Sequence, residues 1–294
     1  MRVAVIGGNG QLGHDVVRAF IDKGDHALSL THSDIEITQL ESVSRGLVPL
    51  GVQVIVNTAA MHNVEACERE PQRAFAVNAL GARNLASVAR DLGALLIHVS
   101  TDYVFDGTKA GPYEESDAPR PLNVYGNTKL AGEYFVRCTT ERHFVLRTSG
   151  LYGNHLCRGK GGLNFVELML KLAKERPEIR VVDSEVVSPT YTADLAHQIG
   201  ALSRNDCYGL YHATAEGSCS WFEFARTIFA STHTSANLQV AAPNEFPAKV
   251  PRPKYSVLEN RGLKARGLNT FRSWEEGLRE YLGVSKVCAK GQAS

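Results

Sequence analysis

The sequence predicts an α/β protein with a doubly wound parallel sheet and a smaller C-terminal lobe. Short apolar runs alternate with longer amphipathic runs through the first half of the chain. A glycine cluster follows the first apolar run at once, and the alternation loosens after about Leu151. Strands that alternate with helices are typical of βαβ units, and such units build parallel sheets.

The expected strands of the first half are short and almost wholly apolar, as buried parallel strands should be. They cover residues 3–6, 26–30, 52–56, 94–99 and 143–146. Apolar residues at helical spacing predict helices over 11–23, 71–91 and 123–138. In the second half we expect strands at 179–182 and 208–212, and helices at 163–174, 192–202, 220–229 and 274–282.

Composition narrows the class of protein. A chain of 294 residues can bury a large core, and 32 Lys and Arg against 31 Asp and Glu leave a net charge of +1. That balance argues against a general nucleic-acid binder or a membrane-surface protein. No apolar stretch approaches the ~20 residues of a membrane span. The six cysteines form no C-x-x-C pair, so we expect reduced thiols, no metal site and a cytoplasmic location.

The first motif is the glycine cluster between a predicted strand and a predicted helix. It places Gly7, Gly10 and Gly13 in a G-x-x-G-x-x-G pattern. Glycines allow the backbone to approach a pyrophosphate, which binds at the helix N-terminus. The pattern predicts a Rossmann-type dinucleotide site, with cofactor contacts from Gly7, Asn9, Gly10, Gln11, Leu12 and Gly13.

The end of the second strand bears on the choice of cofactor. An acid there would bind the ribose hydroxyls of NAD. The sequence has Leu30-Thr31-His32-Ser33 instead, and Asp34 follows. We therefore favour NADPH, with NADH left open.

The second motif places Tyr125 and Lys129 on one face of a predicted helix, because residues four apart are neighbours there. A tyrosine pKa of about 10 is too high for easy proton transfer at neutral pH. A lysine cation about 4 Å away would lower it by about 3 units at an effective dielectric of 20. The pair predicts a tyrosine general acid. The alternative is an ordinary surface tyrosine and lysine.

Polar residues at the end of the fourth strand form the third motif. Ligands of such sheets bind beyond the carboxyl ends of strands, where Thr101 and Asp102 lie. A hydroxyl here can bond a substrate carbonyl, although an ordinary polar strand end is the alternative. Among other residues, Asn78 is either functional or structural, and we expect His98 and Trp221 to be core residues.

These motifs together resemble the extended short-chain dehydrogenase/reductase family, and within it the dTDP-4-dehydrorhamnose reductase group. The segments that carry the resemblance are 7–13, 57–60, 76–79, 100–107, 121–133, 146–148, 164–166, 188–190 and 252–253. The stretches Ser-Thr-Asp-Tyr-Val-Phe and Asn-Val-Tyr-Gly-Asn-Thr-Lys-Leu-Ala-Gly-Glu are specific to this group.

The resemblance implies roles for particular residues. Thr101, Tyr125 and Lys129 would be the catalytic trio, with Tyr125 and Lys129 also contacting the cofactor. Further cofactor contacts would come from Ala59, Ala60 and Asn78. The substrate would be a nucleotide-diphosphate 4-keto-6-deoxysugar bound by Asp102, Tyr103, Val104, Phe105, Tyr152, Phe165 and Arg252. We expect no nucleic-acid or membrane partner, and we leave a homodimer open.

The chain departs from this group at one place. A tryptophan usually stands in a run like Arg-Thr-x-Trp-x-Tyr-Gly, where this sequence has Gly150. We expect Gly150 to leave an open space near the sugar, which Tyr152 or Phe165 could fill.

The domain prediction follows from these motifs. We expect residues 1–150 to form the dinucleotide-binding domain, with 186–207 returning to it. Residues 151–185 and 208–294 would form the substrate-binding lobe.

The expected activity is NAD(P)H-dependent reduction of a nucleotide-linked ketosugar. One alternative is a sugar-nucleotide epimerase or dehydratase, although the second acid that dehydratases carry after the threonine is replaced here by Tyr103. The other is a non-catalytic NADP-binding regulatory subunit of a synthetase, because related subunits share this fold.

Overall fold

A parallel sheet with helices on both faces forms the larger part of the protein. The computed structural model describes residues 1–157, 162–242, 245–246 and 249–283. Six strands of the described chain build this sheet in the order β10-β5-β4-β3-β1-β2, and every neighbouring pair is parallel. Their bounds are β1 Arg2–Ile6, β2 His26–Leu30, β3 Val54–Asn57, β4 Leu95–Thr101, β5 His143–Thr148 and β10 Gly209–His212. The predicted fold class is confirmed.

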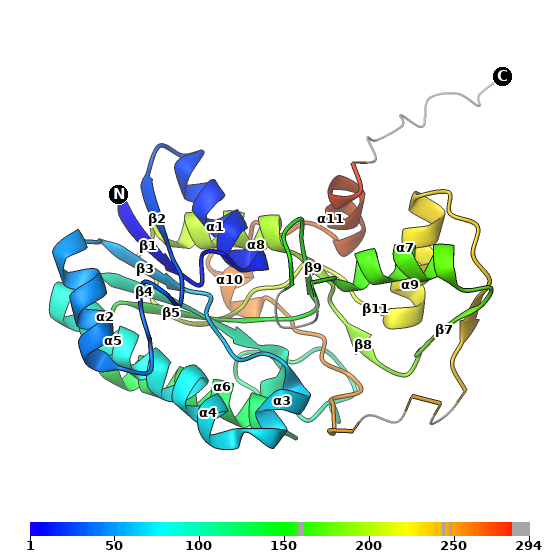
Figure 1. Cartoon of the computed structure of the whole chain (residues 1–294), viewed down its shortest axis with the longest axis horizontal. Helices are drawn as coiled ribbons and strands as arrows, with labels where there is room; N and C mark the ends of the chain where they lie inside the picture. Colours follow the sequence, from blue (N-terminus) through cyan, green and yellow to red (C-terminus); the bar gives the residue numbers. More distant parts are fainter. Residues whose placement is uncertain (158–161, 243–244, 247–248, 284–294) are drawn as a thin grey trace.

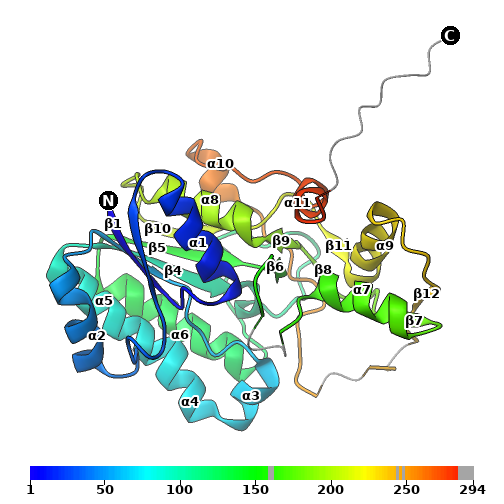
Figure 2. The ribbon, with the colours of Figure 1, turned by 45° about the horizontal axis from the view of Figure 1, so that its top comes forward.

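Helices cover both faces of the sheet (Figures 1 and 2). On one face lie α1 (Gln11–Ile21) and α8 (Thr192–Leu202), which pack against each other. On the other lie α2 (Leu40–Leu47), α4 (Pro71–Phe75), α5 (Gly81–Leu92) and α6 (Val124–Thr139), and α3 (Val64–Arg69) contacts α6. No helix among the described residues is long and apolar enough to cross a membrane.

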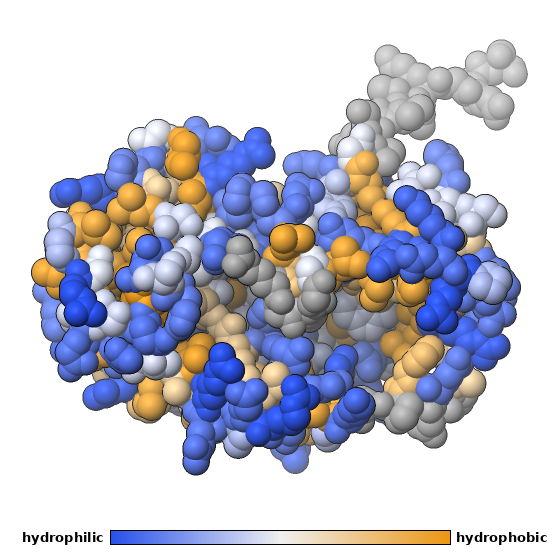
Figure 3. Space-filling view, in the orientation of Figure 1, coloured by the Kyte–Doolittle hydropathy of each residue, from blue (hydrophilic) through white to orange (hydrophobic). Residues whose placement is uncertain are grey.

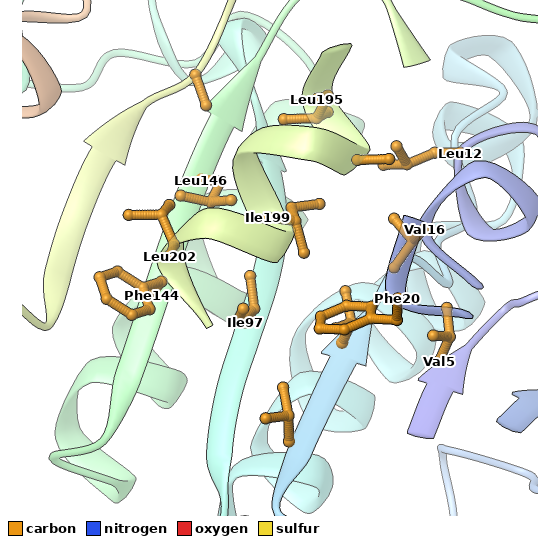
Figure 4. Close-up of a cluster of buried hydrophobic side chains, with 14 of the residues drawn as sticks. Val5, Leu12, Val16, Phe20, Ile97, Phe144, Leu146, Leu195, Ile199 and Leu202 are labelled. Carbon is orange, nitrogen blue, oxygen red and sulfur yellow. The ribbon is translucent and has the colours of Figure 1, made fainter. Parts of the chain in front are cut away.

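Apolar side chains fill the space between the sheet and α1 and α8 (Figure 4). Val16 and Phe20 of α1 meet Ile199 of α8 above Val5 and Ile97 of the strands, and each of these side chains is at most 1% exposed. At about 25 cal/mol for each Å² of apolar surface, burial of this layer is the main force that fixes α1 over the sheet.

The second half of the chain adds a smaller lobe beyond the carboxyl ends of the strands (Figure 1). Its elements are β6 Leu151–Tyr152, α7 Phe165–Glu175, β7 Ile179–Val181, β8 Val186–Val187, β9 Thr190–Tyr191, β11 Cys219–Ser220, α9 Trp221–Ser231, β12 Leu238–Val240 and α11 Trp274–Tyr281. Short strand pairs and a separate apolar cluster around Phe224 hold this lobe together.

The structure corrects the domain prediction both within 208–294 and within 186–207. We expected residues 208–212 in the smaller lobe, but they form β10, which pairs in parallel with β5 at the edge of the main sheet. Helix α10 (Arg261–Ala265) packs against β10. Helix α8, within 186–207, lies on the main sheet side, but β8 and β9 of the same range belong to the smaller lobe, where they pair with β11 and β6.

The helix expected over 71–91 is present, but its middle is not α-helical. A π-helix, η2 (Ala76–Leu80), lies between α4 and α5. Two short helical turns, η1 (Val48–Leu50) and η3 (Asp102–Val104), complete the described elements. Sheet order reverses at β1, which has β2 on one side and β3 on the other, so ligand binding is favoured beyond the carboxyl ends of β1 and β3.

Candidate active site

A cavity of about 580 Å³ lies at the carboxyl edge of the sheet and extends to the smaller lobe. Thr101 from β4 and Tyr125 and Lys129 from α6 all line it. Gly10 and Gln11, at the start of α1, line the same cavity. The structure therefore brings the predicted trio and the glycine cluster to one site. On the face seen in Figure 3, polar and apolar side chains are interspersed around the junction of the two parts.

The glycine cluster fits a dinucleotide diphosphate. The N-cap of α1 is Gly10, no side chain caps this helix end, and its first turn carries no acid. The free N–H groups and the helix dipole therefore favour an anion. A Cβ on Gly13 would lie 2.2 Å from the Gly7 carbonyl oxygen, so only glycine allows this tight loop. Gly7 and Asn9 belong to the loop but do not line the cavity, whereas Leu12 and Gly13 do.

Asp34, which could bind a ribose, is engaged with its own loop. Its Oδ2 accepts hydrogen bonds from the Thr31 backbone N–H and hydroxyl, both at 2.8 Å. These bonds hold the pKa of Asp34 below its usual value. The carboxylate thus already has two donors within the turn after β2.

Tyr125 of α6 is partly buried, and its ring centroid lies 5.8 Å from that of Tyr103 in η3. Burial raises its pKa above the usual value, while a hydrogen bond with Thr101 acts in the opposite direction. The expected lowering of the tyrosine pKa by Lys129 is not found, because the lysine amine donates instead to the Val99 carbonyl at 2.6 Å. Tyr125 is therefore fully protonated at neutral pH.

Lys129 is only 2% exposed. Burial lowers its pKa to about 8, and the nearby Glu133 carboxylate opposes this. Glu133 is itself held by the Arg147 guanidinium, whose Nη2 lies 2.7 Å from Oε2, and by the Ser100 hydroxyl. The lysine thus titrates within reach of neutral pH.

Asp102 lies beside the trio and also lines the cavity. It accepts hydrogen bonds from the hydroxyls of Thr101 at 3.0 Å and Ser149 at 2.8 Å. Burial outweighs these bonds and raises the pKa of Asp102. The hydroxyl network fixes the turn in which Thr101 stands.

Asn78 serves the architecture of the site. It lies in the π-helix, is 1% exposed and does not line the cavity. Its amide exchanges hydrogen bonds with the backbone of Met61 and donates to the Thr128 hydroxyl at 2.9 Å. The contacts support the structural alternative for this residue. They tie the loop after β3, where Ala60 lines the cavity and Ala59 adjoins Gly7, to helix α6.

The expected substrate residues divide into two groups. Asp102, Tyr103, Phe165 and Arg252 line the cavity. The expectation is wrong for Val104, Phe105 and Tyr152, which are at most 1% exposed and do not line it. Val104 and Phe105 pack in an apolar cluster with Tyr113, and Tyr152 packs among Tyr191, Phe224 and Tyr281.

Gly150 does not open the space we expected. It lines the cavity with a φ of +58°, and a Cβ there would lie 3.0 Å from the Cα of Pro189. The aromatic wall comes instead from Trp221, which we had expected in the core. Its ring lies 4.6 Å from that of Phe165, and both line the cavity. The Ser-x-x-Glu cap of α9 (Ser220 to Glu223) marks Trp221 as the first residue of a helix, but it does not indicate that the ring faces the cavity.

One cluster elsewhere has metal-ligating side chains. His14, Asp15 and His155 place ligand atoms within 4.8 Å of one another, so these residues could hold a metal ion. Asp15 already accepts a hydrogen bond from the Thr192 hydroxyl, and the two imidazole rings stack on each other. Contacts within the protein account for this cluster.

A Rossmann-type sheet with a tyrosine and lysine four residues apart at its carboxyl edge defines an extended short-chain dehydrogenase/reductase. The chain belongs to the family described as "RmlD substrate binding domain", which it matches over residues 1–286.

Curated relatives and solved structures extend over nearly the whole chain. The spore coat polysaccharide biosynthesis protein SpsK of Bacillus subtilis is 39% identical, with 96% of both chains covered. A dTDP-4-keto-6-deoxy-D-glucose reductase of Streptomyces niveus is 37% identical, with 94% of this chain and 95% of that one covered. The crystal structure of dTDP-4-dehydrorhamnose reductase from Bacillus anthracis, in complex with NADP, matches with a TM-score of 0.91 and 38% identity, covering 97% of this chain and 99% of that one.

Proposed function

We propose that the protein is an NADPH-dependent reductase of a nucleotide-linked 4-keto-6-deoxysugar, with dTDP-4-dehydrorhamnose as the first candidate. The observation that carries this proposal is the meeting of Thr101, Tyr125 and Lys129 in the cavity that begins at the uncapped N-terminus of α1. Related proteins named for reduction of dTDP-linked ketosugars support the substrate class.

The chain's own groups act on the carbonyl oxygen. When bound, the nicotinamide cofactor supplies the hydride. The Thr101 hydroxyl bonds and orients the carbonyl. Tyr125, protonated at neutral pH, donates a proton to the oxygen as negative charge develops there. Lys129 orients the ribose and, when charged, stabilises the tyrosinate that remains.

The other end of the cavity suits the nucleotide. Arg252 lines it and can pair with a diphosphate. Trp221 and Phe165 form an aromatic wall on which a base or a sugar ring can stack. We assign substrate contacts to these three residues and to Asp102 and Tyr103.

NADPH is the proposed cofactor, because Asp34 is bonded to Thr31 and no other acid follows β2 directly. The neighbouring structure from Bacillus anthracis holds NADP, which supports the same choice. We also propose a cytoplasmic location, supported by the free thiols of Cys67, Cys138, Cys207 and Cys219, and we propose that a homodimer is possible.

Two other functions remain as outcomes of the test. An epimerase or dehydratase would convert a nucleotide sugar without net consumption of NADPH. A regulatory subunit would bind NADPH without turnover.

The experiment is NADPH oxidation with a small panel of nucleotide-linked 4-ketosugars, with the products identified by mass spectrometry. We expect stoichiometric NADPH consumption and a product two mass units heavier than the substrate. NADPH binding with no reduction of any ketosugar would overturn the proposal.

A further inference from the structure

The reaction as proposed does not use His98, a buried titratable group beside the site. His98 of β4 is 1% exposed and lies against the amine of Lys129, with 3.5 Å between its Nε2 and Nζ. We propose that His98 is a positioning residue that controls the protonation of Lys129 by presenting a ring N–H to its amine. This inference rests on the proposed function in one respect, because the proposed function gives Lys129 its catalytic role.

The hydrogen bonds of Asn57 determine which nitrogen of His98 carries the proton. Asn57, at the end of β3, is 2% exposed. Its Oδ1 accepts the backbone N–H of Ala59 at 3.1 Å, so the amide nitrogen must face the histidine. That nitrogen lies 3.0 Å from His98 Nδ1. An amide nitrogen can only donate, so Nδ1 accepts and the neutral ring carries its proton on Nε2.

The opposite orientation fails on the same contacts. Turning the Asn57 amide would place its NH2 group against the N–H of Ala59, leaving two donors face to face in a buried position. An unsatisfied buried donor costs about 1–3 kcal/mol. A charged His98 is disfavoured as well, because burial and the Lys129 cation hold its pKa well below the usual value.

The N–H on Nε2 of His98 affects the protonation state of Lys129. An ammonium group has only donors, so the N–H on Nε2 opposes it. A neutral amine has a lone pair that can accept this N–H, and it can still donate to the Val99 carbonyl at 2.6 Å. His98 therefore favours the neutral amine.

Other charged groups around the lysine act in the opposite direction or are already engaged. Glu133, one turn along α6, favours the ammonium, but it shares its charge with Arg147 from β5 and a hydrogen bond from Ser100. Asp102 in η3 is buried among hydroxyls, which leaves it a weak counter-charge. Tyr125, on the same helix face, is neutral at pH 7. The balance holds Lys129 close to its point of titration, where small changes at the site can shift its charge.

The test measures Lys129 itself. Trace acetic anhydride labels only neutral amines, so the pH dependence of labelling, followed by peptide mass spectrometry, reports the pKa of this lysine. His98→Asn keeps an acceptor for Asn57 and removes the N–H that faces Nζ. His98→Phe fills the volume with no ring nitrogen. His143→Asn is the matched control, because His143 on β5 bonds the Thr140 carbonyl.

We expect both His98 variants to raise the labelling midpoint by about one pH unit, which slows labelling at pH 8 about five-fold. The control should match the wild type. Midpoints within about 0.3 unit of wild type in both His98 variants would overturn the proposal. Lysine labelling needs no turnover, so it tests this inference separately from the proposed function. If the protein reduces no ketosugar but the labelling midpoint of Lys129 shifts in the His98 variants, the proposed function is contradicted and this inference is supported.

A measurement on the unaltered protein keeps the test independent of folding in the variants. Long-range 15N–1H spectra of histidine-labelled protein distinguish the two neutral tautomers and the charged ring. We expect His98 to carry its proton on Nε2 from pH 6 to pH 9. A proton on Nδ1, or a charged ring in that range, would overturn the proposal.

Discussion

Gly126 of α6 lies so close to Tyr103 of η3 that a Cβ on the glycine would sit 2.2 Å from the Tyr103 carbonyl oxygen. This approach sets the distance between the turn that carries Thr101 and the helix that carries Tyr125 and Lys129. The glycine that follows Tyr125 is thus part of the geometry of the site rather than a spacer.

Replacement of this glycine should therefore separate the two elements. Gly126→Ala forces a methyl group into a backbone oxygen, and overpacking of this kind costs roughly 1–3 kcal/mol. We expect lower stability in urea unfolding and reduced kcat. Gly111→Ala is the control, because nothing lies within 4 Å of its Cβ position. Equal stability of the two variants would show that α6 can shift freely.

The buried amine of Lys129 predicts an unusual pH dependence of stability. Its pKa is lowered from 10.5 to about 8 by burial, so between these values the unfolded chain binds a proton that the folded chain does not. Stability from this group therefore rises with pH across that window, and below pH 8 the folded state bears the buried charge.

The variant Lys129→Met should consequently be more stable than wild type at pH 7, by up to about 3 kcal/mol, with the gain fading towards pH 10. Urea unfolding at several pH values measures it. Lys171→Met, at an exposed lysine on α7, is the control and should show no such trend. A constant difference between pH 7 and pH 10 would mean that Lys129 is charged throughout.

Cofactor preference tests the turn after β2. With the Asp34 carboxylate bonded to Thr31 at 2.8 Å, we expect NADPH to bind at least as tightly as NADH. Fluorescence titration of both cofactors decides this. A strong preference for NADH would mean that Asp34 leaves its turn and reaches the ribose.

Sugar recognition is better tested by mutation of Trp221 than by mutation of Gly150. Gly150 has a φ of +58°, so substitution there strains the backbone whatever the pocket requires. Trp221→Leu should change relative kcat/KM among ketosugars by about 10-fold or more, since one such contact is worth about 1–3 kcal/mol. Phe222→Leu is the control, as Phe222 does not line the cavity. An unchanged sugar preference in Trp221→Leu would show that Trp221 does not contact the sugar.

The sequence predicted those features that depend on local pattern. Apolar runs predicted the strands of the main sheet. The G-x-x-G-x-x-G spacing predicted the tight loop that ends at Gly13, and a separation of four residues predicted that Lys129 lies on the same helix face as Tyr125. The sequence did not predict which way particular side chains point in the folded protein. Periodicity could not reveal that Tyr152 packs into the lobe core while Trp221 faces the cavity, because Tyr152 ends a strand of two residues and Trp221 is the first residue of its helix. Nor could spacing show that the Lys129 amine bonds the Val99 carbonyl.

In the proposed reaction, Tyr125 gives the proton to the carbonyl that is reduced. Single-turnover NADPH oxidation by Tyr125→Phe, with Tyr134→Phe as control, tests it most directly, because Tyr134 is 56% exposed on the same helix. We predict a rate at least ~100-fold below wild type for Tyr125→Phe, with NADPH affinity retained, and a wild-type rate for the control. A near-normal rate in Tyr125→Phe would show that Tyr125 is not the proton donor.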